Sequence, residues 1–226
     1  MFVNPVRPIP QIFTLNRINL MKFFRIALVT LVLLVNLVIA PPSWASKPNL
    51  TQGTDYTEVT QAIDNLVKLK ETPADSPYTP EEIAQKLGDL KLQKYILETA
   101  QDWAQCRNET GKTLAVYAHK PKKLAQGNTL YFLGNGQVTD NDWDCDGVYL
   151  PIGTKLPGDT EGLTEPLAIK VVDGTQLVAK TNLETGVVEF NITPANVFKS
   201  GGIDWLIPNL TQADIDAKIP DAPIED

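Results

Sequence analysis

An unbroken uncharged run from Ile26 to Ala40 divides this chain into a leader and a part that can fold. The leader is basic, and the first acidic residue of the whole chain is Asp55. Small residues at Ser43 and Ala45 complete the three-part pattern of a secretory signal peptide. The run is shorter than the roughly 20 residues that a transmembrane helix needs. We therefore expect residues 1–45 to be a cleaved signal peptide, with a retained membrane anchor as the alternative.

The position of the true start is a separate question. Met21 is followed at once by Lys22 and Arg25, which form a compact basic segment ahead of the apolar run. Residues 1–20 have no pattern of their own. We expect them to result from a misassigned start, and they are excluded from reasoning about the fold.

The leader ends in Ala40-Pro-Pro-Ser-Trp-Ala45-Ser46. This ending resembles the signals of cyanobacterial proteins that are exported to the thylakoid lumen or the periplasm. The resemblance covers only the targeting segment. It implies an oxygenic phototroph and an extracytoplasmic location, in either the lumen or the periplasm, and it implies no activity.

The mature part is strongly acidic. Removing residues 1–45 takes away four of the 20 basic residues and none of the 27 acidic ones, which leaves a net charge of −11. Nucleic acid is therefore not expected as a partner, because phosphate binding needs a basic surface. Such a charge favours solubility and repels anionic membrane surfaces.

Two cysteines, Cys106 and Cys145, both lie in the mature part. They form no C-x-x-C pair, which argues against a redox-catalytic or zinc site built on cysteine. In an oxidising compartment the expected form is one structural disulfide. Closing a loop of this length would stabilise the fold by about 4 kcal/mol in the chain-entropy model. Two buried free thiols are the alternative.

The segment 46–104 is expected to begin with a helix. Asp55 is predicted as its N-cap, with Glu58 three residues later as in a capping box. Apolar residues then recur at helical spacing as far as Val67. A proline-rich break follows and ends this first helix.

A second helix is predicted to begin at Thr79. Thr79 would be its cap, Pro80 occupies the first helical position, and Glu82 can bond back to the cap. Gly88 is expected to interrupt this helix. Residues 90–104 fit either a continued helix or an early strand, so the sequence leaves this stretch open.

Residues 105–207 change to short strands separated by turns. Asp173-Gly174 predicts a tight hairpin, and Leu183–Gly186 predicts a second one. We therefore predict an α+β fold, in which a short N-terminal helical segment precedes a mainly antiparallel β-sandwich or small barrel tied by the disulfide. The strand-like runs are residues 113–117, 129–133, 167–172, 176–181 and 187–191.

The last part of the chain, residues 208–226, has a different composition. It is acidic and contains three further prolines. Such a composition favours a short surface segment or a loose tail, and we expect one of these here.

The most informative stretch for chemistry is Asp142-Trp-Asp144-Cys-Asp146-Gly147, preceded by Asp140. Its D-x-D-x-D-G pattern opens many calcium loops, because alternate carboxylates supply the oxygen ligands that a hard cation needs and the glycine permits a sharp turn. The pattern predicts a weak calcium site on Asp142, Asp144 and Asp146, with Asp140 as a further candidate. The intervening side chains would point away from the ion, and Cys145 would then serve as a disulfide arm.

The calcium prediction has a strong competitor. The twelfth position counted from Asp142 is Gly153 rather than the glutamate of an EF-hand, and no confident pair of helices flanks the loop. The alternative is an Asp-rich turn in solvent, which ends one strand and leads into the next at Val148. No other cofactor is expected from the sequence.

His119 is the only histidine of the chain. No serine lies in a nucleophile-elbow setting beside which it would act as a general base, so catalysis by His119 is not predicted. His119 instead belongs to a basic spot on an acidic protein, which would suit docking on an acidic partner. A solvated hairpin tip is the alternative. The residues of this spot are Lys112, His119, Lys120, Lys122 and Lys123.

These features together predict a non-enzymatic accessory or binding protein outside the cytosol, peripheral to a membrane complex. The second hypothesis is a β-sandwich module that binds calcium or carbohydrate, which exposed aromatics at Trp143, Tyr149 or Trp205 would support; as core residues they would not. The third is a hydrolase that uses two carboxylates, although no pair can be singled out from the sequence.

Overall fold

The computed structural model describes residues 48–72, 76–121 and 129–225 of the chain. Residues 47–226 form one compact unit. The expected leader, residues 1–45, lies outside the described residues, as do Lys122 and Lys123. Within the described part of the chain, none of the helices combines the length and the hydropathy needed to span a bilayer.

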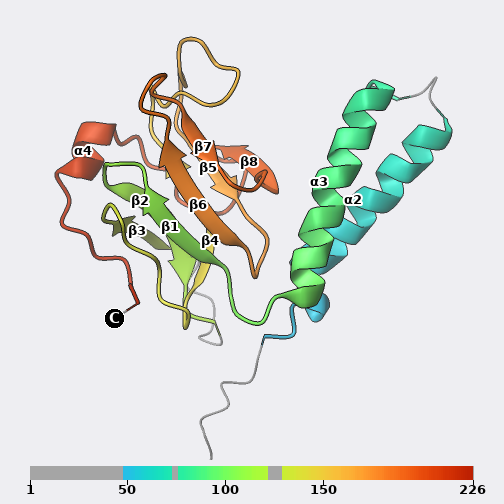
Figure 1. Ribbon diagram of the computed structural model, residues 1–226, viewed down its shortest axis with the longest axis horizontal. Helices are drawn as coiled ribbons and strands as arrows, with labels where there is room; N and C mark the ends of the chain where they lie inside the picture. Colours follow the sequence, from blue (N-terminus) through green and yellow to red (C-terminus); the bar gives the residue numbers. More distant parts are fainter. Residues whose placement is uncertain (1–47, 73–75, 122–128, 226) are drawn as a thin grey trace, which may run out of the picture. The chain divides into compact units, whose positions relative to one another are not determined.

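The fold is α+β, as the sequence predicts (Figure 1). Helices are concentrated before Gln105, and strands follow it. The helices are the 3-10 turn η1 (Leu50–Gln52), α2 (Thr54–Glu71), α3 (Pro80–Thr99) and α4 (Gln212–Asp216). The strands are β1 (Gln105–Glu109), β2 (Leu114–His119), β3 (Thr129–Leu133), β4 (Asp144–Leu150), β5 (Leu167–Lys170), β6 (Gln176–Thr181), β7 (Val188–Phe190) and β8 (Asn196–Lys199).

The strands form two sheets. The five-stranded sheet has the order β3-β2-β4-β5-β8, and all of its pairs are antiparallel. The three-stranded sheet has the order β1-β6-β7, in which β1 and β6 run parallel. Buried residues from both sheets belong to one hydrophobic cluster, so the two sheets pack as a sandwich over a shared core.

The disulfide between Cys106 and Cys145 is confirmed, and it lies inside this core. Both cysteines are completely buried, and their Cα atoms are 5.9 Å apart, within the usual range for a disulfide. Since Cys106 lies on β1 and Cys145 on β4, the bond links one sheet covalently to the other.

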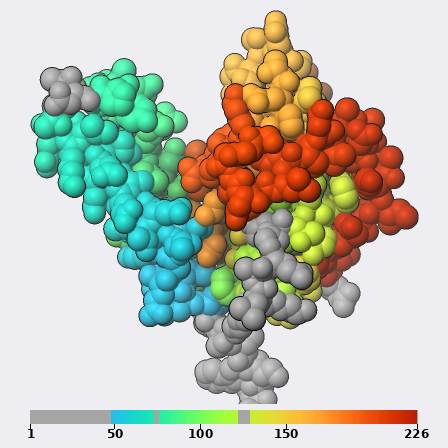
Figure 2. Space-filling model, turned by 180° about the vertical axis from the view of Figure 1, so that it is seen from behind, coloured from blue at the N-terminus to red at the C-terminus, as the bar shows by residue number. Residues whose placement is uncertain are grey.

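The outer face of the five-stranded sheet carries a second core. Tyr117 and Tyr149 are fully buried there, packed with Trp205, Ile207 and Ile215 from the C-terminal segment. The same segment lies as a continuous orange-red to red layer over the surface in Figure 2. With both faces covered, a central strand such as β2 is buried at almost every position, which explains its apolar sequence without alternation.

Residues 208–225 are mostly exposed, as the expectation of a short surface segment has it, but they are fastened to the sandwich and do not form a loose tail. The Tyr149 hydroxyl donates to the carbonyl of Pro208 at 2.8 Å, and Ile215 of α4 is 1% exposed. Further on, Asp221 and Phe132 bond to each other, and Ile224 forms an isolated bridge with Thr139. Because apolar residues lie between the prolines, the acidic composition did not reveal how much of this segment is packed.

The N-terminal helices α2 and α3 pack side by side through Leu66, Ile83 and Leu87 (Figure 1). The predicted capping box at Thr79 and Glu82 is confirmed. The predicted break at Gly88 is wrong, because α3 continues through it to Thr99. Burial of Leu87 and Leu97 on the same helix compensates for the cost of an exposed glycine, which is only about 1 kcal/mol.

The predicted hairpin at Asp173-Gly174 is wrong in its pairing. The turn exists, and Gly174 has a φ of 78°. However, β5 before it belongs to the five-stranded sheet and β6 after it to the three-stranded sheet, so the chain crosses the sandwich here. The second predicted hairpin is confirmed, since β6 and β7 pair antiparallel with Thr181 opposite Val188.

Candidate functional site

One histidine and two aspartates lie close together at one end of the β2–β4 ladder. His119, the last residue of β2, lies opposite Asp144, the first residue of β4. The register then shifts, because Ala118 pairs with Cys145 while Tyr117 pairs with Gly147. Asp146 is therefore the extra residue of a β-bulge, and bulges commonly re-aim a side chain beside a site.

The bulge brings three potential ligands together. His119 Nδ1 and Asp146 Oδ2 are 2.6 Å apart, and Asp144 Oδ1 accepts a hydrogen bond of 3.1 Å from the backbone N–H of Ala104. One ligand atom each from His119, Asp144 and Asp146 lies within 4.8 Å of the other two. Asp144 is 1% exposed, whereas the His119 side chain is 36% exposed, so the cluster is buried at its base and open at the imidazole.

A second charged group borders this cluster. The Lys170 ammonium, on β5, forms a buried ion pair with Asp55 of α2 and lies 4.0 Å from Glu58. The other Asp55 oxygen accepts a 3.2 Å hydrogen bond from the backbone N–H of Asp173. Through these bonds Asp55 fastens the start of α2 to the turn between β5 and β6.

Carboxylates outnumber cations in this region. Among the described residues, the cations identified beside Asp55, Asp144, Asp146 and Asp173 are Lys170 and the titratable His119. Burying a charge without a partner is costly, so such an excess is stable only if some of the acids are protonated or a cation joins them.

The pKa values of the acids respond to this burial. Burial raises the pKa of Asp144 well above its usual range, and the nearby Asp173 and Asp146 raise it further. Burial and the charge of Asp55 raise the pKa of Asp173 to about 7. Burial also raises the pKa of Asp146, against the opposing effect of its bond to His119, and that same bond raises the pKa of His119. The acids of this cluster therefore release their protons at a higher pH than ordinary aspartates do.

The structure brings together only part of the predicted calcium loop. Asp144 and Asp146 converge, but Asp142 lies exposed in the preceding turn, where its N–H donates to Asp140 Oδ1 at 2.7 Å. The alternative of a solvated Asp-rich turn is wrong for Asp144, because β4 begins there and the side chain is buried.

Gly147 has a different role from the sharp turn that the pattern suggested. It lies within β4, where a Cβ atom would come within 2.0 Å of the carbonyl oxygen of Ile169 on β5. The glycine thus allows the close approach of two strands beside the bulge.

Two members of the predicted basic spot, Lys112 and His119, lie at opposite ends of β2. Lys112 precedes β2 and His119 ends it, and at about 3.3 Å per residue the two lie roughly 20 Å apart along the chain. His119 is engaged with Asp146, Lys120 follows it, and Lys122 and Lys123 lie outside the described residues. Of the aromatic candidates for a ligand platform, Tyr149 and Trp205 are core residues, and Trp143 is half-buried edge-on against Tyr131.

Sequence reasoning missed three members of the site. Asp55 was predicted as an N-cap, but Gly53 is the N-cap of α2 and Asp55 is buried in the ion pair. Asp173 was taken only as a turn residue. Lys170 carries the one signal that could have found them, since a lysine between Ile169 and Val171 in an apolar strand needs a buried partner.

The chain matches no model of a known protein family, no curated protein and no solved structure. The fold and the site alone therefore define its class. It is an α+β protein with two disulfide-linked sheets and a buried cluster of one imidazole and several carboxylates at one end of the sandwich.

Proposed function

We propose that this protein is a non-enzymatic extracytoplasmic binding protein, and that its binding function is to hold a divalent cation at His119, Asp144 and Asp146. The observation that carries the proposal is the convergence of these three side chains, with ligand atoms within 4.8 Å of one another, at the bulged end of β4. Two of them are carboxylates in a region where acids outnumber cations, so a bound cation would lower the cost of burying them.

The donor set favours a different ion from the one that the sequence pattern suggested. Calcium prefers oxygen ligands in numbers that this cluster does not provide. An imidazole with two carboxylates suits zinc or manganese, which accept mixed nitrogen and oxygen ligands. The partly exposed face of His119 leaves room for a fourth ligand from solvent.

The disulfide supports the proposal that the protein resides in an oxidising, extracytoplasmic compartment. A disulfide that is fully buried between two sheets is a structural bond, and such bonds form and persist in oxidising compartments. The thylakoid lumen or the periplasm would be such a place. For the partner we propose a membrane protein complex on the extracytoplasmic side. The acidic mature chain, with a net charge of −11, supports an association through charge that salt would release.

Thermal unfolding of the full-length, oxidised protein with zinc, manganese, calcium or a chelator tests the cation. At about 100 times the dissociation constant, a bound ion stabilises the fold by about 2.7 kcal/mol, which raises the melting temperature by about 5 °C or more. We expect this rise with zinc or manganese, and we expect Asp146→Asn and His119→Gln to abolish it.

Asp142→Asn is the matched control, because it removes a carboxylate of the same sequence pattern that lies outside the cluster. It should leave the rise unchanged. The proposal fails if no cation raises the melting temperature, or if Asp142→Asn abolishes a rise that Asp146→Asn preserves.

The partner is tested by purifying a C-terminally tagged copy from its native host. Recovery with a defined membrane complex, released by salt rather than by detergent, would support the accessory role. Recovery as a free monomer at low salt would count against it.

A further inference from the structure

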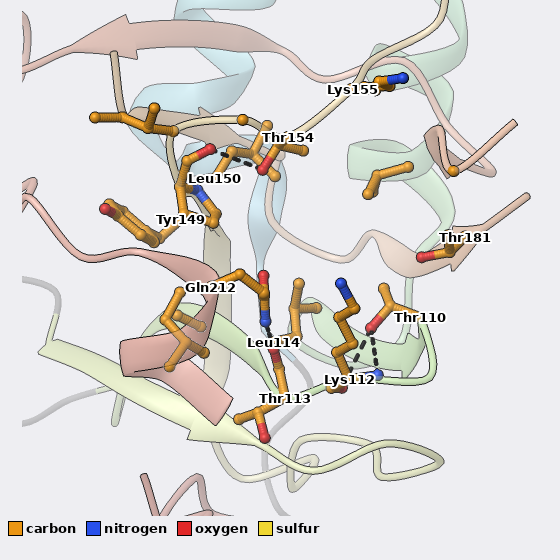
Figure 3. Close-up of a pocket in the computed structure, with 17 residues that line it drawn as sticks. Thr110, Lys112, Thr113, Leu114, Tyr149, Leu150, Thr154, Lys155, Thr181 and Gln212 are labelled. Atoms are coloured by element: carbon orange, nitrogen blue, oxygen red, sulfur yellow. Dashed lines mark hydrogen bonds between the residues drawn. The ribbon is translucent and has the colours of Figure 1, made fainter. Parts of the chain in front are cut away.

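A cavity of about 180 Å³ lies at the opposite end of the β2–β4 ladder from the acidic cluster. Its walls come from the turn before β2, the end of β4 with the loop that follows it, the β6–β7 turn and α4. Figure 3 shows the Lys112 side chain extending into this space, with Leu114 and Gln212 beside it and Thr154 across from it.

The charged side chains that line the cavity are lysines, while the Asp216 carboxylate lies behind the wall and accepts a hydrogen bond from the Thr113 N–H. Lys112 and Lys155 line the cavity, and the described lining residues include no aspartate or glutamate. This is unusual placement in a chain with 27 acidic residues and 20 basic ones. A cavity lined by lysines attracts small anions. A large anionic molecule would also meet the acidic surface around the cavity, which repels it.

The two lysines also differ from those on the strands. Lys170 pairs with Asp55, Lys180 with Glu109 and Lys199 with Glu165. For Lys112 and Lys155, no ion pair is formed with any residue in the described part of the chain. Their charge is therefore available to a ligand.

The hydroxyl groups around the lysines divide into two kinds. Thr154 donates to the carbonyl of Pro151 at 2.8 Å, and Thr110 bonds to Asn108 at 2.7 Å, so both protons are already used. The hydroxyls of Thr113 and Thr181 make no side-chain hydrogen bond within the described residues. Lys112 and Lys155 thus border one space from opposite sides, together with the Thr181 hydroxyl.

The frame of the cavity is firmly held. Gln212 of α4 donates to the carbonyl of Thr113 at 2.9 Å, and the backbone N–H of Thr113 donates to Asp216. Leu150 and Ile215, both buried, form part of an apolar floor. A preformed cavity that joins an apolar floor to a few charged groups is the usual form of a small-molecule site.

We infer that this cavity binds a small organic anion, with its carboxylate or phosphate group held by Lys112 and Lys155 and its apolar part resting on Leu150 and Ile215. Thr181 supplies a neutral hydrogen bond to the same group. The site is separate from the proposed cation site, since the two lie at opposite ends of the same strands.

The test is an NMR titration of the oxidised full-length protein with benzoate and, separately, with inorganic phosphate, each to about 10 mM, which detects even millimolar affinity. We expect amide shifts at residues 110–115, 150–155 and 181–188. Response to benzoate alone would define an apolar carboxylate as the ligand class, and response to phosphate alone would define a phosphate ester. Either result supports an anion site.

The lysines are tested by Lys112→Met and Lys155→Met, which keep the length of the side chain. Each should weaken binding about tenfold or more, as expected for a charged contact to an anion. Lys91→Met, at an exposed position of α3, is the matched control and should bind as the unchanged protein does.

Lys155→Glu gives a second readout, because reversing the charge should abolish binding without filling the cavity. The inference is overturned if neither anion causes shifts around the cavity, if the shifts lie elsewhere, or if the lysine variants bind as tightly as Lys91→Met.

Discussion

The two ends of the β2–β4 ladder differ in the sign of their charged side chains and in how deeply these are buried. At one end, His119, Asp144 and Asp146 are crowded into a partly buried cluster beside the Lys170–Asp55 pair. At the other end, Lys112 and Lys155 line a cavity whose described lining residues include no carboxylate. The strands between them are apolar and buried on both faces.

The difference shows why charge has a structural cost at one end and little at the other. Buried acids must be protonated, paired or bound to a cation, so their identity is tied to the stability of the fold. Solvated lysines keep their hydration, so they can be changed with small consequences for folding. Without a bound cation, substitutions that remove charge should therefore change the free energy of unfolding more at the acidic end than at the basic end.

The largest effect is expected from breaking the buried pair at the acidic end. Lys170→Met would leave Asp55, 5% exposed, without its ammonium partner. Removing one partner of a buried pair costs about 3–5 kcal/mol, because the other charge stays buried and uncompensated. Urea unfolding measures the loss. Lys199→Met is the matched control, since its pair with Glu165 is exposed and should cost less than about 1 kcal/mol. Equal losses in the two variants would contradict the comparison.

The next largest effect is expected in the pH dependence of the free energy of unfolding, measured with a chelator present. Folded Asp173 keeps its proton up to a pKa of about 7, whereas an ordinary aspartate releases it near 3.8. Between these values the folded state binds more protons, so the free energy of unfolding falls as pH rises, by up to about 1.4 kcal/mol per pH unit for each proton. The raised pKa values of Asp144 and Asp146 act in the same direction.

Urea unfolding at pH 5 and at pH 7.5 measures this slope. The protein should be more stable at pH 5, and Asp173→Asn should reduce the difference because the amide does not titrate. The double variant Lys112→Met/Lys155→Met should keep the full difference. A free energy of unfolding that is higher at pH 7.5 than at pH 5 would show that the buried acids do not cause the pH dependence. A difference that Asp173→Asn leaves unchanged would show the same for Asp173.

The smallest effect is expected at the basic end. Lys112→Met and Lys155→Met should each change the free energy of unfolding by less than about 0.5 kcal/mol, because neither side chain has an ion pair with a described residue to lose. The same urea experiment measures it. A loss of several kcal/mol would mean that these lysines support the fold rather than face a ligand.

The sequence predicts those parts of this molecule that depend on local chemistry. The capping box at Thr79 and Glu82, the β6–β7 hairpin and the Cys106–Cys145 bond each follow from neighbouring residues or from a single possible pairing. The prediction fails where local chemistry allows two outcomes. A turn at Asp173-Gly174 is compatible with a hairpin and with a crossing between sheets, and only the partners β1 and β8 decide between them.

The same limit explains the candidate site. The sequence pattern singled out Asp144 and Asp146, whose side chains converge in the structure, because both lie in one acidic stretch. It could not add His119 or remove Asp142, since the β-bulge that brings His119 to Asp146 depends on the register of β2 against β4. Asp55 and Lys170 are 115 residues apart, and no local pattern joins them.

The parallel pairing of β1 with β6 constrains the order in which the chain can assemble. Gln105 lies opposite Gln176, so β2, β3, β4 and β5 of the other sheet all precede the neighbour of β1 in the chain. Cys145 arrives earlier, and its bond to Cys106 spans only 39 residues. The disulfide can thus hold β1 against β4 before β1 is paired, which shortens the search that slows non-local pairing. In this order of events, oxidation would precede the pairing of β1 with β6, in addition to linking the two sheets of the finished fold.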